Sequence, residues 1–117
     1  EVPLPHRGRD ERPWGGFVQF TQNESCTVKL ITVRVGQQFS LQTHASRDEF
    51  WKILSGTGTI TTGDISVEGH PEDEFWIPRG SRHRARAVGS DLIFLEISFG
   101  EFDENDITRL EDDYGRN

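Results

Sequence analysis

The chain has 117 residues and a formal net charge of −7, which fits one compact domain and excludes the phosphate-backbone binding on which nucleic-acid partners depend. Its composition, 32% hydrophobic with 12 Gly and 5 Pro, is poor for a helical bundle and suits many short strands. A single cysteine, Cys26, excludes an intrachain disulfide. No apolar run reaches membrane-spanning length and no signal-peptide pattern is visible, so we expect a cytoplasmic protein without a membrane or nucleic-acid partner.

The N-terminal residues 1–15 are rich in Pro, Gly and Arg and predict an extended arm, followed by one domain over residues 16–117 with a short C-terminal tail. Strand-like runs in that domain alternate with turn sequences that contain Gly, Pro, Asn or Asp. The expected strands are 16–21, 25–35, 39–42, 50–55, 58–62, 65–68, 74–77, 83–87 and 92–98. Such evenly spaced short strands predict an all-β antiparallel barrel or sandwich. One short helix is expected near residues 103–110, within an otherwise solvated acidic segment.

Alternation of side chains places a carboxylate on the buried face of a strand. In the segment 49–55, Glu49, Trp51 and Ile53 share one face, and the last two are expected to be core residues. Glu49 therefore points into the barrel, where an unpaired carboxylate is very costly. We expect it to find partners in its own segment and in the later sequence PRGSRH.

Those partners form a predicted metal site. Two imidazoles, a carboxylate and an amide oxygen can coordinate a divalent ion, and imidazole suits Zn, Fe, Ni or Cu. The predicted ligands are Gln42, His44, Glu49 and His83. Because a neutral amide is a weak ligand, Gln42 has the alternative role of supporting the other three. One divalent metal is expected, Zn first, with Fe, Mn, Ni or Co as alternatives.

The spacing of these residues resembles that of a known superfamily. Two motifs carry the resemblance: Gly36, five residues, Gln42-x-His44, four residues, Glu49, six residues, Gly56; and Pro78-x-Gly80-x-x-His83. They resemble the two cupin motifs, with Gln42 in place of the usual first histidine. The resemblance implies a single cupin barrel, also called a double-stranded β-helix or jelly-roll.

A narrower resemblance covers most of the chain. The segments RPWGGF, VKLITVRVGQQFSLQTHASRDEFWKILSGTG, WIPRGSRHR and ITRLEDDYGR are similar to type II mannose-6-phosphate isomerases. These cupins commonly form the C-terminal part of bifunctional enzymes with a mannose-1-phosphate guanylyltransferase. The chain departs from the family at Ala45 and Ser46, where a histidine run is common, at Phe50, where His is common, and at Ala87, which replaces an Asn. The resemblance also implies a homodimer, with the arm 1–12 as a candidate for crossing between protomers.

The resemblance implies a metal-dependent aldose–ketose isomerase that interconverts mannose 6-phosphate and fructose 6-phosphate. Arg47 or Lys29 would hold the phosphate or the developing negative charge, and Glu96 is the candidate base. Each has a plainer interpretation: a surface ion pair of Arg47 with Asp48 or another acid, an outward-facing Lys29, and an ion pair of Glu96 with Arg or Lys. Two other functions stay open, a non-catalytic sugar- or sugar-phosphate-binding cupin and another metal-cupin enzyme such as a dioxygenase.

Overall fold

The computed structural model describes residues 8–115, in which eleven β-strands and no helix are found. The strands are β1 (Gly8–Arg12), β2 (Gly15–Gln19), β3 (Cys26–Val33), β4 (Leu41–Thr43), β5 (Arg47–Ser55), β6 (Gly58–Thr62), β7 (Ile65–Gly69), β8 (Glu74–Ile77), β9 (His83–Ala87), β10 (Leu92–Gly100) and β11 (Thr108–Glu111). The expected all-β class is confirmed. In this part of the chain, no helix is long and apolar enough to cross a membrane.

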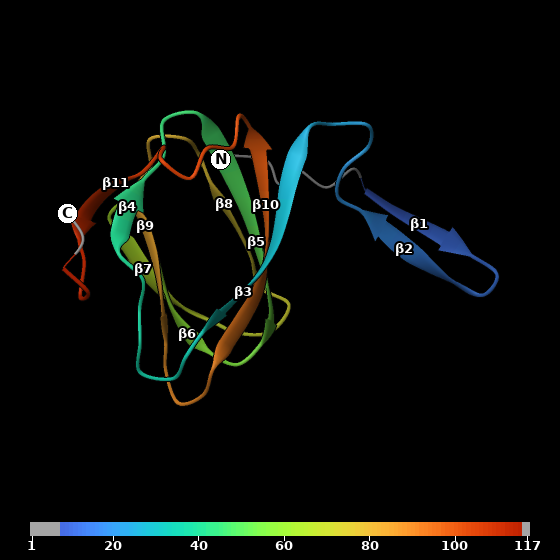
Figure 1. Ribbon diagram of the computed structural model, residues 1–117. Coiled ribbons are helices and arrows are strands. Elements are labelled where there is room, and N and C mark those ends of the chain that lie inside the picture. Colours follow the sequence, from blue (N-terminus) through green and yellow to red (C-terminus); the bar gives the residue numbers. More distant parts are fainter. Residues whose placement is uncertain (1–7, 116–117) are drawn as a thin grey trace.

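Two antiparallel sheets form the body of the molecule and face one another (Figure 1). One has the strand order β3-β10-β5-β8 and the other the order β11-β4-β9-β6-β7. Over residues 8–115 no strand pairing joins the two sheets, so the barrel is not closed by hydrogen bonds. The end strands β3 and β11 therefore each have one edge without a strand partner in the described structure.

The core fills the space between the two inner faces. Trp51 and Phe94 stack with ring centroids 4.7 Å apart, and Phe39 meets Trp51 edge-on at 6.0 Å. The buried apolar cluster consists of Val33, Trp51, Ile53, Ile60, Ile77, Ala85, Ala87, Leu92 and Phe94. These side chains alternate with outward-facing residues along their strands, as the period of a half-buried strand requires.

Strands β1 and β2 pair in a separate two-stranded hairpin that projects away from both sheets (Figure 1). Trp14, at its turn, is 75% exposed. The expected boundary between arm and domain, after residue 15, falls inside this hairpin, and β1 was not among the predicted strands. Residues 1–7 of the expected arm lie outside the described residues.

The helix expected near residues 103–110 is wrong. Residues Thr108–Glu111 form strand β11, which pairs with β4. Leu110 is 47% exposed, while Ile107 and Arg109 line the cavity, which is the alternation of an extended strand. The open edge of β4 offers backbone partners instead, and tertiary pairing therefore overrides local preference.

Candidate metal centre

The four predicted ligands converge between the two sheets. Gln42 on β4 lies directly opposite His83 on β9, so both side chains share the inner face of the five-stranded sheet. His44 follows one residue after β4 ends. Glu49 reaches them from β5 in the opposite sheet, on the same buried face as Trp51. Segments far apart in sequence thus place their polar side chains at one buried point.

His44, Glu49 and His83 are close enough to bind one cation. His44 Nε2 lies 3.4 Å from Glu49 Oε2, and His83 Nε2 lies 3.8 Å from Glu49 Oε1. One ligand atom from each residue lies within 4.8 Å of the others. Bonds of about 2.0–2.2 Å to a zinc ion place adjacent ligand atoms roughly 3.4 Å apart, so small side-chain movements suffice. The three side chains are at most 4% exposed.

Both imidazoles are held in the tautomer that a metal requires. His44 Nδ1 lies 2.6 Å from the carbonyl oxygen of Asp106, and His83 Nδ1 lies 3.0 Å from that of Ser81. A carbonyl oxygen only accepts, so each Nδ1 carries the proton and each Nε2 presents a lone pair to the centre. The Nε2 of His83 is buried without a hydrogen-bond partner within the described structure. A buried nitrogen without a hydrogen-bond partner is unusual in a folded protein, and it fits a role of His83 Nε2 as a metal ligand.

Glu49 is held as a carboxylate by its neighbours. Arg47 Nε donates to its Oε2 at 3.1 Å, and the indole of Trp51 donates to its Oε1 at 3.0 Å. Burial alone raises the pKa of Glu49, but the electrostatic interaction with the His83 and His44 rings and these two hydrogen bonds bring the pKa below its ordinary value. The carboxylate is therefore ionised at neutral pH, which is the state that a cation needs.

Arg47 belongs to the interior and not to the surface. Its side chain is 6% exposed, and its Nη2 donates to His44 Nε2 at 3.2 Å. The alternative ion pair with Asp48 does not form, because Asp48 pairs with Arg79 at 3.1 Å. Arg47 thus lies beside the ligand atoms, where it can balance the negative charge of Glu49 or of a bound molecule.

Glu96 and Lys29 lie on the inner face next to the centre. They are opposite one another on β10 and β3, and Glu96 is also opposite Trp51 on β5. Burial is the main cause that raises the pKa of Glu96 to about 8, with the neighbouring negative charge of Glu49 second. Ser98 Oγ lies 3.4 Å from its Oε2. The plainer interpretation of Lys29 as an outward-facing lysine is wrong, since Lys29 lines the cavity beside the centre.

A cavity of about 200 Å³ gathers these groups. Its lining consists of Lys29, Ile31, Phe39, Gln42, His44, Arg47, Glu49, Glu96, Glu104, Ile107 and Arg109. All predicted site residues therefore either line this cavity or, like His83, belong to the adjoining ligand cluster. Gln42 accepts a hydrogen bond from Ser40 Oγ at 3.2 Å through its amide oxygen, so its role as ligand or support stays a prediction.

Residues 101–107 lie beside this cavity, and their contacts with the site residues were not predicted from the sequence. The carboxylate of Asp106 accepts the backbone N–H groups of Ala45 at 2.8 Å and of Ser46 at 2.9 Å. These bonds bring the pKa of Asp106 below its ordinary value. The Phe102 ring lies beneath the Arg47 guanidinium at 4.3 Å. A strand predicted over the C-terminal segment would have placed Ile107 and Arg109 on one face, and this is the sequence signal that could have identified Arg109.

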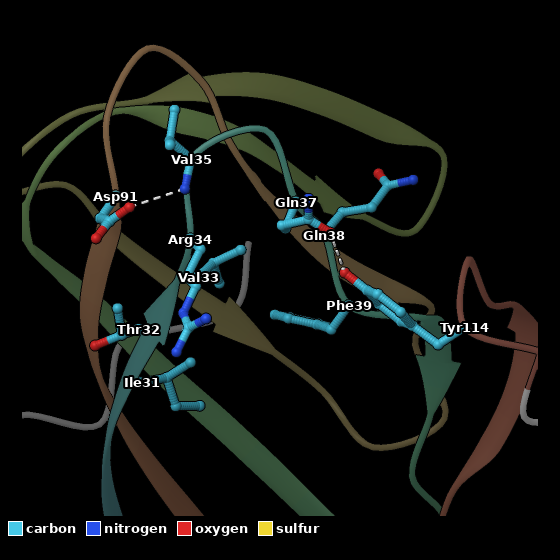
Figure 2. A pocket seen from close by; sticks show the side chains of 10 residues that line it. All are labelled: Ile31, Thr32, Val33, Arg34, Val35, Gln37, Gln38, Phe39, Asp91 and Tyr114. Carbon is cyan, nitrogen blue, oxygen red and sulfur yellow. Dashed lines mark hydrogen bonds between the residues drawn. The ribbon is translucent and has the colours of Figure 1, made fainter.

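A larger cavity of about 800 Å³ lies beside this one and shares Ile31 and Phe39 with it. Figure 2 shows its residues, where Asp91 accepts the backbone N–H of Val35 at 2.9 Å. Its lining contains no histidine and Asp91 as the one acid, so it offers no set of metal ligands. Size alone therefore does not identify the functional cavity of this fold, and the smaller polar one is the candidate.

Two facing antiparallel sheets with a buried His–Glu–His cluster between them define a cupin barrel. A solved cupin protein from Bacteroides fragilis has a similar fold, with a TM-score of 0.59 and 25% identity, covering 64% of this chain and 65% of that one. The sequence of residues 5–112 matches the family described as Mannose-6-phosphate isomerase C-terminal, and the chain belongs to this family.

Longer bacterial proteins share this domain. Xanthan biosynthesis protein XanB of Xanthomonas campestris is 38% identical over 107 residues, which are 90% of this chain and 23% of that protein. Mannose-1-phosphate guanylyltransferase ManC of Salmonella typhimurium is 36% identical over 108 residues, which are 90% of this chain and 22% of that protein. The chain thus spans less than a quarter of the length of these relatives.

Proposed function

We propose that this chain is a metal-dependent aldose–ketose isomerase that interconverts mannose 6-phosphate and fructose 6-phosphate. The observation that supports the proposal most directly is the buried cluster of His44, Glu49 and His83, with both Nε2 atoms aimed at one point. Membership of the mannose-6-phosphate isomerase C-terminal family supports the substrate. Two histidines and a carboxylate favour Zn²⁺, which these donors bind in many enzymes.

The isomerisation moves a proton between two adjacent carbons. A bound divalent ion supplies Lewis-acid polarisation of the carbonyl and hydroxyl oxygens at those carbons. Glu96 is the proposed base: it faces the same cavity and, with its pKa raised to about 8, can take and return a proton near neutral pH. Arg47 stabilises the negative charge that develops on the oxygens when the proton leaves.

The experiment compares the wild type with Glu96→Gln. Conversion of mannose 6-phosphate is followed in a coupled assay on metal-loaded protein, and bound metal is measured by mass spectrometry. We expect kcat to fall about 10²–10⁴-fold, the range of general acid–base catalysis, while metal content stays at the wild-type level. Glu68→Gln is the matched control because Glu68 is 74% exposed on β7 and far from the chemistry. Wild-type kcat in Glu96→Gln would exclude Glu96 as the base, and no turnover by the wild type would exclude the isomerase.

A second candidate, a non-catalytic protein that binds sugar phosphates, is favoured by one contact. The Arg47 guanidinium donates hydrogen bonds to Glu49 Oε2 and His44 Nε2, two atoms that would otherwise be available to a metal ion. A site of this kind can hold an anionic sugar without metal. Sugar-phosphate binding by metal-free protein, with no turnover after metal loading, would support this candidate over the isomerase.

A further inference from the structure

We infer that Lys29 and Arg109 form the subsite for the phosphate group of the ligand, and that Glu104 occupies it in the free protein. The inference rests on the proposed function in one respect, that the ligand of this cavity carries a phosphate monoester. It assigns a role to Arg109 and to Glu104, and it separates the anion-binding end of the cavity from the metal-binding end.

Of the three basic side chains that line the cavity, two form ion pairs and one does not. Arg47 is paired with Glu49 at 3.1 Å, and Lys29 is paired with Glu104 at 3.0 Å. Glu96 is engaged with Glu49 and Ser98. Glu96 is therefore the one acid of the lining that belongs to neither ion pair.

Arg109 is the cation without a counter-charge. It is partly buried, and its Nε is fully buried with no hydrogen-bond partner among residues 8–115. No ion pair joins its guanidinium to an acid within that range. Because a buried N–H donor without an acceptor is costly, the position of this Nε points to an anionic acceptor that binds there.

Arg109 and Lys29 line the same cavity from end strands of different sheets. Arg109 lies on the end strand β11 opposite Gln42, in the same inward row as His83. Lys29 lies on the end strand β3 of the other sheet, and both line one cavity. The same cavity is lined by His44 and Glu49, so an anion bound by both cations leaves the rest of a sugar within the cavity that contains the ligand cluster. Arg presents several N–H donors to phosphate and Lys adds a point charge.

In the free protein, the carboxylate of Glu104 occupies the position that we assign to the phosphate. Its carboxylate contacts Lys29 Nζ, yet its side chain is 75% exposed. An exposed ion pair contributes little to stability, so a dianionic phosphate can displace it at small cost. Glu104 therefore competes with the ligand, and its removal strengthens ligand binding.

The experiment titrates the metal-loaded full chain with fructose 6-phosphate, unphosphorylated fructose and inorganic phosphate in a calorimeter. The variants are Arg109→Gln, which removes the unpaired charge, and Glu104→Gln, which removes the competitor. Arg86→Gln is the matched control, because Arg86 is exposed on β9 and does not line the cavity. Bound metal and the melting temperature are measured for each variant.

We expect Arg109→Gln to weaken fructose 6-phosphate and phosphate about tenfold or more, as expected for a lost charged hydrogen bond, with unchanged binding of fructose. Glu104→Gln should shift affinity for both anions in the opposite direction, and Arg86→Gln should change neither. Equal affinities in Arg109→Gln and Arg86→Gln, or no binding of either anion by the wild type, would overturn the subsite. Turnover with an unchanged KM in Arg109→Gln would overturn the subsite but not the isomerase. Arg109-dependent binding without turnover would overturn the isomerase but not the subsite.

Discussion

Replacement of His83 tests whether the buried cluster holds a metal. In the wild type, Zn²⁺ at a hundredfold excess over its dissociation constant adds about 2.7 kcal/mol to the free energy of unfolding. For a domain of about this size, 1 kcal/mol raises the melting temperature by roughly 4 °C, so the expected shift is about 10 °C. His83→Ala removes the Nε2 atom that lacks a partner, and the shift should disappear.

The variant also changes the metal-free protein, for a reason visible in the packing. The His83 ring meets Trp51 edge-on at 5.7 Å, so truncation to alanine leaves a cavity beside the largest core side chain. His83→Leu keeps more of the volume without a metal-binding atom and separates this packing loss from the loss of a ligand. Both variants should lose the metal-dependent shift, although their metal-free melting temperatures differ.

The assay is a thermal melt followed by fluorescence, with and without Zn²⁺, together with metal analysis of protein purified without a nickel column. His70→Ala is the matched control, since His70 is 52% exposed in a turn and contacts Glu68 and Asp73. It should keep the full shift. If His83→Ala keeps the shift, or if the wild type shows none at saturating metal, the interpretation of the cluster as a metal site is refuted.

Three further predictions concern the loop over the site, a turn and the assembly. Asp106→Ala removes the acceptor that fixes the loop holding His44, and metal affinity should fall about 10- to 100-fold, as for other supporting residues. Gly56→Ala should destabilise strongly, because a Cβ at this positive φ of 82° would lie 1.9 Å from a backbone oxygen. The hairpin of β1 and β2 should be buried against a second copy, because an isolated hairpin is marginally stable in water. Light scattering should show a dimer that Trp14→Ser weakens.

Each of these predictions has a control and an opposing result. Asp10→Ala removes an acid of the β1–β2 hairpin, which projects away from both sheets (Figure 1), and equal metal affinity in it and in Asp106→Ala would contradict the role of the loop. Gly80→Ala has a similar φ of 81° but no atom within 4 Å of the new Cβ, so it isolates the backbone strain. Equal unfolding free energies of the Gly56 and Gly80 variants would contradict the steric argument. A wild type that is monomeric at all concentrations would contradict the predicted homodimer.

Alternation along single strands was enough to orient several side chains of the site. The face shared by Glu49, Trp51 and Ile53 was predicted from the sequence, and all three are buried. The strands β6, β8 and β9 have the predicted bounds because Gly, Pro and Asp residues flank short strand-forming runs. Where local chemistry and tertiary pairing agree, the sequence is sufficient.

The convergence of strands from different sheets could not be derived in this way. Nothing in the local pattern states that His83 faces Gln42, since that register depends on which strands pair. The two cupin motifs supplied this information through resemblance. Arg109 and Asp106 were missed for a different reason: an acidic run usually forms a solvated surface, whereas here it covers the cavity.

The placement of charges in the two sheets follows from what burial allows. The three proposed metal ligands lie at the buried middle, where each is held by a hydrogen bond and where a low dielectric strengthens attraction to a cation. Arg109 and Lys29 lie on the end strands, where water can reach their charges before a ligand does. In the proposed arrangement, the phosphate therefore binds at the end strands and the reactive end of the sugar points to the buried cluster.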